Sequence, residues 1–179
     1  LDLSMASVII PGKDFLGHCN YRNVSELHLR LYKINLGRWD RIQGIWRTEE
    51  KLSLLDGLDI YRAWSQPLPD AEDLNFHAAE IPFEAVETGF YILLASEDAS
   101  FKVSGDNTLQ LIPVNASALS YSFEDIGGQL SGRVINRFSG EVIVDCELAI
   151  YRNKYNPVTR SNEWRYLESV YSNNEGVFN

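Results

Sequence analysis

The chain has 179 residues, of which 25 are acidic and 16 are basic, so its formal net charge is -9. This balance excludes a typical nucleic-acid-binding protein, because neutralising phosphates requires a local surplus of Lys and Arg. Hydrophobic residues make up 45% of the chain and aromatic residues 12%, which excludes an intrinsically disordered segment and predicts a folded one.

The ends of the chain and its apolar runs bear on where the protein resides. The sequence begins at Leu1, and no basic segment with a following apolar stretch of the signal-peptide kind comes after it. We therefore expect the chain to be an excised piece of a longer protein. Its longest apolar runs, such as residues 90–95, are far shorter than the roughly 18 to 20 residues that a membrane helix needs. The sequence predicts no membrane span in this segment.

Alternation of apolar and polar residues dominates the chain, and this pattern is typical of strands with one face on a core. It is clearest at residues 26–33, where Leu27, Leu29 and Leu31 alternate with polar side chains. Other predicted strands cover residues 7–10, 15–22, 58–65, 77–81, 89–96, 109–113, 118–123, 129–136, 146–152 and 164–172. Many short strands joined by turns predict an all-β fold, an antiparallel β-sandwich. We expect Leu29, Leu31, Tyr91 and Leu93 to be buried in it.

One segment departs from the alternation. Apolar residues between Trp39 and Leu55 recur at spacings of three and four, and the segment ends at Asp56 and Gly57. This spacing predicts one helical insertion between strands, with Gly57 at the C-terminal cap.

A second departure, at residues 125–128, predicts a domain boundary. Gly127 and Gly128 are adjacent, and paired glycines are cheapest in a linker or a tight corner. We therefore expect a complete sandwich over residues 1–124 and a second unit over residues 126–179. The second unit has about 54 residues and three or four strands, whereas a closed sandwich needs about seven strands, so it is predicted to be an incomplete β unit.

Several short motifs carry a resemblance to a known family. The first half contains Val8–Phe15 (VIIPGKDF), Tyr21–Val24 (YRNV), Leu27–Lys33 (LHLRLYK) and the Gly89-Phe90-Tyr91 strand entry. The second half contains Leu130–Asn136 (LSGRVIN), Ser139–Ile143 (SGEVI), Cys146–Tyr151 (CELAIY) and Asn174–Phe178 (NEGVF). In this order the motifs resemble macroglobulin-like domains, which are immunoglobulin-like β-sandwiches, of the bacterial alpha-macroglobulin family. The second half is also similar to carboxypeptidase-regulatory-like repeats and other surface β-sandwich repeats.

The resemblance implies a scaffold segment of a larger extracytoplasmic protein that traps proteases in the periplasm or cell envelope. It implies other domains of the same full-length chain as partners, and proteases as further partners. The reactive element of that family is a thioester in a Cys-x-x-Gln motif, and neither Cys19 nor Cys146 is followed by such a glutamine. No reactive residue can therefore be carried over. Two other functions stay open: a surface glycan-binding or adhesin module, and an accessory domain of a secreted enzyme.

Residue chemistry gives no support for catalysis. The chain has three His, and each lies in a predicted strand; His18 and its neighbour Cys19 would point to opposite faces. The acidic stretch at residues 70–73 lacks the glycine of a calcium loop and is predicted to be a solvated loop. We expect no enzyme activity, no cofactor and no metal, and we expect Cys19 and Cys146 to be buried free thiols.

An interaction surface is the remaining candidate site. Residues 153–162 form a predicted loop that is long for a hairpin, and such loops often carry function. Exposed aromatic side chains are expected beside it and at Trp39, which follows a turn. The candidate residues are Trp39, Arg152, Lys154, Tyr155, Arg160 and Trp164.

Overall fold

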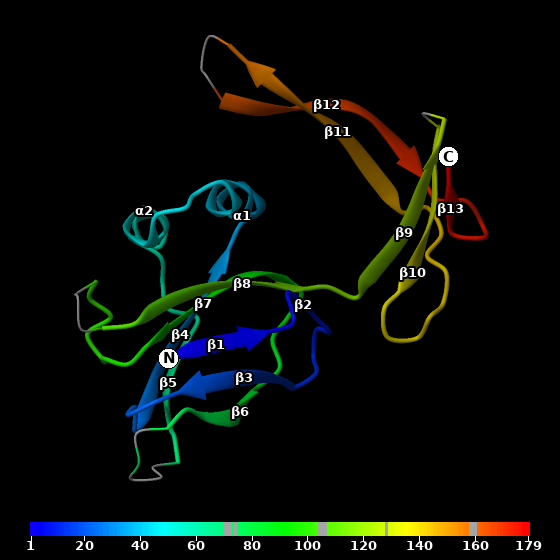
Figure 1. The fold of residues 1–179 in the computed structure, drawn as a ribbon. Helices are drawn as coiled ribbons and strands as arrows, with labels where there is room; N and C mark the ends of the chain where they lie inside the picture. The colour runs from blue at the N-terminus through cyan, green and yellow to red at the C-terminus, as the bar shows by residue number, and fades with distance from the viewer. Residues whose placement is uncertain (70–72, 74, 104–106, 128, 158–160) are drawn as a thin grey trace. The chain divides into compact units, whose positions relative to one another are not determined.

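A computed structural model describes residues 1–69, 73, 75–103, 107–127, 129–157 and 161–179 (Figure 1). The chain divides into two compact units, unit 1 over Leu1–Ser117 and unit 2 over Ala118–Asn179. Across the described residues, every helix is too short or too polar to cross a membrane.

Unit 1 is a β-sandwich with two short helices. Its elements are β1 (Asp2–Met5), β2 (Val8–Ile9), β3 (Phe15–Tyr21), β4 (Glu26–Ile34), α1 (Leu36–Gln43), α2 (Thr48–Ser53), β5 (Arg62–Pro67), β6 (His77–Phe83), β7 (Gly89–Ser96) and β8 (Leu109–Ala116). One sheet has three strands in the order β1-β3-β6, and the other has five in the order β2-β8-β7-β4-β5. All neighbouring strands are antiparallel except β2 and β8, which are parallel.

The core of unit 1 confirms the predicted phase of its two central strands. Leu29 and Leu31 on β4 and Tyr91 and Leu93 on β7 are all buried, and they belong to one apolar cluster. The alternate residues of β7, Ile92 and Leu94, form a second buried cluster together with residues of the helical segment. Strand β7 therefore reads as a continuous apolar run because both of its faces are covered.

The predicted helical insertion between strands is confirmed, and it consists of two short helices, α1 and α2. The side chain of Asn35 accepts a hydrogen bond from the Arg38 amide and caps the start of α1. Helix α1 ends at Gly44, a residue that weakens a helix, and α2 ends at Leu54. Gly57 follows later at φ +74° and is a turn residue rather than the cap.

Two further differences concern strand ends. Strand β5 begins at Arg62, where its regular pairing with β4 starts, rather than at the predicted residue 58. Just before it, the Tyr61 amide donates a hydrogen bond to the Leu31 carbonyl. Strand β1 was not predicted. Its four residues are too few to show an alternation, and pairing with β3 defines them as a strand.

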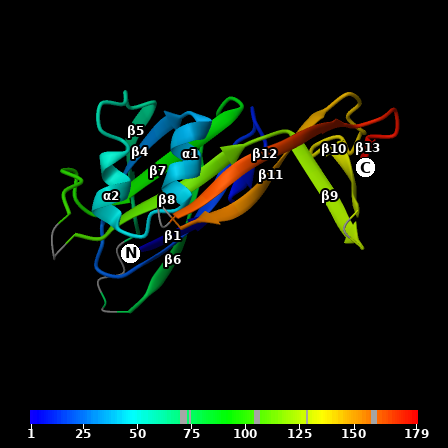
Figure 2. The same ribbon diagram turned by 90° about the horizontal axis from the view of Figure 1, so that it is seen from above.

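Unit 2 consists of a three-stranded sheet and a separate hairpin. Its strands are β9 (Leu119–Ile126), β10 (Gln129–Asn136), β11 (Glu147–Asn156), β12 (Ser161–Tyr171) and β13 (Val177–Phe178). The sheet has the order β13-β10-β9, and β11 pairs with β12 in a long, twisted ribbon (Figures 1 and 2).

The unit boundary lies earlier in the chain than predicted. Ile126 pairs with Gln129, and Gly127 adopts φ +66°, so Gly127, which was predicted to link two domains, instead belongs to the turn of the β9–β10 hairpin. Tight hairpin turns require this left-handed conformation, and glycine adopts it at no steric cost. The expected division at residues 124–126 therefore falls inside unit 2, which begins at Ala118.

Candidate functional site

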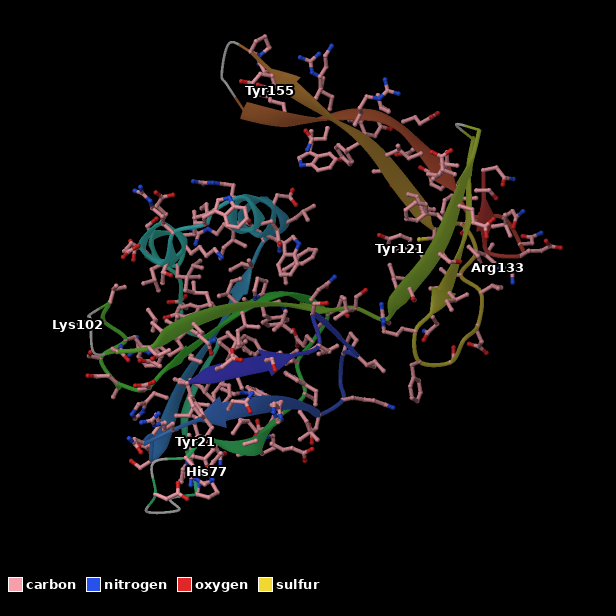
Figure 3. The ribbon with its side chains drawn as sticks, viewed as in Figure 1. Tyr21, His77, Lys102, Tyr121, Arg133 and Tyr155 are labelled. Atoms are coloured by element: carbon pink, nitrogen blue, oxygen red, sulfur yellow. The ribbon has the colours of Figure 1, made fainter. Side chains whose placement is uncertain are left out.

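Most of the residues predicted as an interaction surface lie on the β11–β12 hairpin. Arg152, Lys154 and Tyr155 are on β11, and Trp164 is on β12. The predicted loop at 153–162 is mostly strand, because β11 continues to Asn156 and β12 starts at Ser161. Arg160 lies outside the described residues. Figure 3 shows Tyr155 close to the turn end of the hairpin.

Pairing register gives this hairpin an aromatic face, formed by Tyr151, Tyr155, Trp164 and Tyr166. Tyr151 stands opposite Tyr166, and their ring centroids lie 5.7 Å apart at an angle of 73°. Trp164 stands opposite Asn153, on the same face of the ribbon, and its side chain is 65% exposed. Aromatic rings that remain exposed in a row are typical of a surface that binds something.

The opposite face of the hairpin carries charge. Arg152 stands directly opposite Arg165, and Lys154 stands opposite Glu163. Like charges that face each other across two strands destabilise the pairing, so Arg152 and Arg165 would gain from an anionic partner. The Nη2 atom of Arg165 lies 4.0 Å from a Glu163 carboxylate oxygen, which is the limit of an ion pair.

Trp39 does not share this environment. It lies on α1 in unit 1, partly buried, and its ring packs against Phe90 with centroids 4.9 Å apart. The expectation that Trp39 is exposed was therefore wrong, because the helix turns its ring onto the second cluster. The exposed tryptophan of this region is Trp46, which is 95% exposed.

Unit 2 also contains an apolar groove of about 430 Å³. It is lined by Tyr121 and Phe123 from β9 and by Leu148, Ile150 and Val170 from the hairpin. The rings of Tyr121 and Phe123 are stacked, yet both side chains are more than half exposed. A face this apolar is usually covered by something in the functional state of a protein.

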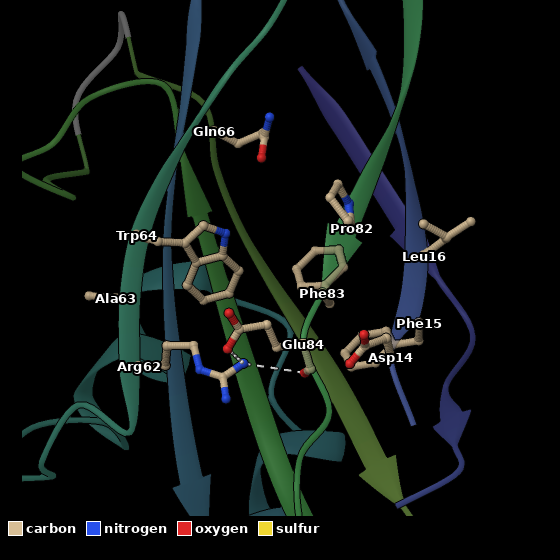
Figure 4. A pocket seen from close by; sticks show the side chains of 10 residues that line it. All are labelled: Asp14, Phe15, Leu16, Arg62, Ala63, Trp64, Gln66, Pro82, Phe83 and Glu84. Carbon is tan, nitrogen blue, oxygen red and sulfur yellow. Dashed lines mark hydrogen bonds and ion pairs between the residues drawn. The ribbon is translucent and has the colours of Figure 1, made fainter. Parts of the chain in front are cut away.

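A larger groove, of about 630 Å³, lies in unit 1 between strands β5 and β6 (Figure 4). Trp64 meets Phe83 edge to face at 5.7 Å, and Phe15 stacks on the other side of Phe83 at 5.0 Å. At one end the Arg62 guanidinium lies 3.2 Å from the Glu84 carboxylate and also donates to the backbone carbonyls of Glu84 and Ala85. No local pattern in the sequence indicates this groove, because its residues come from three distant strands, each of which has an ordinary sandwich sequence.

The cysteines show no sign of activation. Cys19 is completely buried in the unit 1 core, and burial raises the pKa of its thiol, which disfavours the nucleophilic thiolate. His18 and Cys19 have opposite exposure along β3, as expected for adjacent strand residues. Cys146 is partly exposed rather than buried, and both cysteines are free.

His28 takes part in a contact chain whose composition matches a Ser–His–carboxylate triad. Its Nδ1 lies 2.8 Å from the Ser65 hydroxyl, and its Nε2 lies 3.5 Å from a carboxylate oxygen of Glu26. Ser65 stands directly opposite His28 in the β4–β5 pairing, so strand register accounts for the contact. The imidazole–carboxylate distance exceeds that of a hydrogen bond, so Glu26 does not hold the ring as a catalytic carboxylate does.

We expect the purified chain to hydrolyse ester, peptide and glycoside substrates only at the background rate. The physical reason is that the Ser65–His28–Glu26 chain lacks an oriented base. Chromogenic substrates of the three classes measure this directly. Turnover that disappears in both Ser65→Ala and His28→Ala would contradict the expectation, and so would turnover that depends on His18 or His77.

The third histidine fixes the end of a loop. The Nε2 atom of His77 lies 2.8 Å from the Asp73 carboxylate, which also accepts from the backbone and side-chain amides of Asn75. The bond from His77, followed by those from Asn75, lowers the pKa of Asp73 from 3.8 to about 2. Asp70 and Glu72 of the predicted solvated loop lie outside the described residues.

This carboxylate predicts an acid-dependent loss of stability in unit 1. Folding lowers the pKa of Asp73, so the stabilisation is complete above pH 3.8 and is lost as the pH falls through about 2. Thermal unfolding followed between pH 5 and pH 2 should show a smaller decline in Asp73→Asn than in the parent chain. In His77→Ala the pKa of Asp73, measured by NMR, should rise towards its ordinary value. An unchanged pKa in that variant would contradict the assignment.

Within the described residues, no three His, Cys, Asp or Glu side chains come together in a way that could hold a metal ion.

Comparison with known proteins finds similarity in three-dimensional structure alone. No protein-family model matches the chain, and no curated protein matches its sequence. A native alpha-2-macroglobulin fragment from Escherichia coli spanning domains MG0-NIE-MG1 matches with a TM-score of 0.62 and 14% identity, over 96% of this chain and 54% of that one. A second fragment of the same protein, spanning NIE-MG1, matches with a TM-score of 0.59 and 14% identity, over 98% and 84% of the two chains.

The chain therefore spans about half of the first fragment, and at 14% identity the likeness shows the fold alone. Unit 1 is a sandwich that is antiparallel except at the β2–β8 pair, and the strand pairs of unit 2 are antiparallel, as the alternation along the sequence predicted. This chain has the all-β fold of the macroglobulin domains of a bacterial alpha-2-macroglobulin.

Proposed function

We propose that the chain is a structural scaffold segment of a larger extracytoplasmic protein of the alpha-macroglobulin, protease-inhibitor type. The observation that carries the proposal is the extent of the structural likeness, which covers 96% of the chain and runs through both units. Its location would be the periplasm or cell envelope of a bacterium. Other domains of the same full-length chain would be its permanent partners, and proteases would be the targets of the whole protein.

The surfaces of unit 2 support a role in which this segment contacts other domains. Tyr121 and Phe123 leave an apolar groove open, and the β11–β12 hairpin pairs with no further strand in the described part of the chain. Scaffold domains in large assemblies need such surfaces, because contact with neighbours is what holds them in place. We accordingly propose that unit 2 is a partial macroglobulin-like domain, which another segment of the full-length chain completes.

The test uses the full-length protein and a protease such as trypsin. A trapping inhibitor should protect a large protein substrate while leaving the cleavage of a small chromogenic peptide almost unchanged. The double variant Tyr121→Asp with Phe123→Asp should weaken that protection, since charged side chains would prevent a neighbouring domain from covering the groove. The double variant Trp46→Asp with Phe76→Asp, which changes two exposed aromatic side chains of unit 1 outside the candidate surfaces, provides a matched control. Equal cleavage of both substrates with and without the protein would refute the proposal.

The aromatic face of the hairpin favours one second candidate, a glycan-binding surface module. Sugar rings stack on exposed aromatic side chains, and Tyr151, Trp164 and Tyr166 are exposed on one face. Retardation of the chain in gels containing soluble polysaccharides would measure this. Retardation should be lost in Trp164→Ala and kept in Trp46→Ala, which removes an even more exposed tryptophan from unit 1. Equal retardation of both variants, or none of the parent chain, would exclude this candidate.

A further inference from the structure

Strand β5 presents an open sheet edge next to the unit 1 groove. It is the last strand of the five-stranded sheet in the described part of the chain, and its pairing is with β4. The Leu68 amide donates to the Ser25 carbonyl, in line with the β4–β5 register. The backbone N–H and C=O groups of successive strand residues point in alternate directions. Like the Leu68 amide, those of Arg62, Trp64 and Gln66 therefore point to β4. Ala63 and Ser65 therefore direct their N–H and C=O groups to the open edge.

The side chains of the same strand alternate in step with the backbone. Arg62, Trp64 and Gln66 are partly buried and line the groove, whereas Ser65 is exposed on the other face. A strand added to β5 would therefore bond to Ala63 and Ser65 while placing every second side chain over the groove. Main-chain bonds give affinity in this mode of recognition, and the alternate pockets give specificity.

Strand β6, which also borders the groove, is less suited to pairing with an added strand. Strand β6 is the outer strand of the three-stranded sheet, and it contains Pro82, which lines the groove. Proline has no N–H group and blocks the addition of a strand. On β5 the proline is Pro67, at the very end of the strand, so Ala63 and Ser65 keep their donors.

The groove also defines the chemistry of an occupant. Trp64, Phe83 and Phe15 provide aromatic surface at its centre, which suits an aliphatic side chain. Asp14 and Glu84 bring two carboxylates against the single guanidinium of Arg62, so the charged lining side chains carry an excess of negative charge. This excess favours a basic residue at that end of the groove.

We propose that the β5 edge and the adjoining groove bind an extended peptide segment by strand addition. The segment would have aliphatic residues at alternate positions and a basic residue two positions beyond them. This proposal stands on unit 1 alone and does not depend on the protease-inhibitor function.

The probe is the acetylated and amidated peptide Lys-Thr-Val-Thr-Val-Thr-Lys, whose palindromic order allows binding in either direction. NMR titration of the 179-residue chain should shift the amide signals of Ala63 and Ser65 and the indole signal of Trp64. Methylating the backbone nitrogens of the threonines blocks the bonds of an antiparallel added strand, and methylating those of the valines blocks the bonds of a parallel one. One of these two methylated peptides should therefore bind about tenfold more weakly than the unmethylated peptide. Replacing both lysines of the peptide by glutamates should also weaken it.

Variants of the chain separate the backbone donor from the side chain. Ser65→Pro removes the edge N–H and should reduce affinity about tenfold, whereas Ser65→Ala keeps the N–H and should bind as the parent does. Glu84→Gln should weaken binding about two- to fivefold, and the exposed Glu49→Gln on α2 should not. If Ser65→Pro fails to fold, the methylated peptides still test the same bonds.

Several outcomes would overturn the proposal. They are equal affinity for both methylated peptides and the unmethylated one, signal shifts confined to unit 2, and an absence of shifts at millimolar peptide. A dimer of the chain that Ser65→Pro dissociates would assign the edge to a second copy instead. Because these measurements use the isolated chain, failure of strand addition leaves the protease-protection assay of the full-length protein unaffected.

Discussion

Replacing Leu29 by alanine is expected to lower the free energy of unfolding of unit 1 by about 2 to 5 kcal/mol. Leu29 is 1% exposed and stands on β4 between Trp64 on β5 and Ala95 on β7. Removing its branched end takes away apolar contacts and leaves a cavity, because two paired neighbours hold the strand in place. Urea unfolding followed by the NMR signals of unit 1 measures the change.

Leu36→Ala is the matched control for this prediction. Leu36 begins α1 and is more than half exposed, so the same truncation there should change stability by less than about 0.5 kcal/mol. A loss of less than about 0.5 kcal/mol in Leu29→Ala would mean that the side chain does not face the core in solution. The whole of β4 would then be turned, since a shift of one residue exchanges its two faces.

Elements with a strong pattern were predictable from the sequence. Strand β4 contributes side chains to both apolar clusters. The alternation of its leucines directly indicated the face that packs in the first cluster. The helical segment was found, but its division at Gly44 was not. Spacing of apolar residues signals helical conformation over a window, whereas a break depends on the conformation of one residue. Gly127 lies in the turn of the β9–β10 hairpin, where a domain boundary was predicted, because a linker and a tight hairpin turn both favour glycine.

The candidate surfaces were predictable only where one local segment forms them. Arg152, Lys154, Tyr155 and Trp164 lie on a single hairpin, so proximity in sequence placed them together. In the unit 1 groove, by contrast, the segments around Phe15, Trp64 and Phe83 meet through the packing of two sheets. Nothing within one segment signals such a meeting, and long-range pairing is the part of a fold that local patterns leave open.

Gly132→Ala is expected to destabilise unit 2 by about 1 to 3 kcal/mol, with the loss centred on β13. Gly132 pairs with Phe123 on one side and with Phe178 on the other. A Cβ atom at this position would overlap the Ser122 carbonyl oxygen and the Phe178 ring. Because the carbonyl belongs to a paired strand, relieving its overlap requires a shift of the β9–β10 backbone. The ring of Phe178, now buried, would also have to leave its place.

This contact explains two motifs that the sequence alone left unrelated. The LSGRVIN segment supplies Gly132 and the NEGVF segment supplies Phe178, and the pairing of Gly132 with Phe178 and of Arg133 with Val177 joins them. Hydrogen exchange should therefore show faster exchange of the Val177 and Phe178 amides in Gly132→Ala. Ser122→Ala, which leaves the carbonyl unchanged, should exchange as the parent chain does. Equal protection of the Val177 and Phe178 amides in the parent chain and both variants would contradict the prediction. It would show that the packing of Phe178 does not require a glycine at position 132.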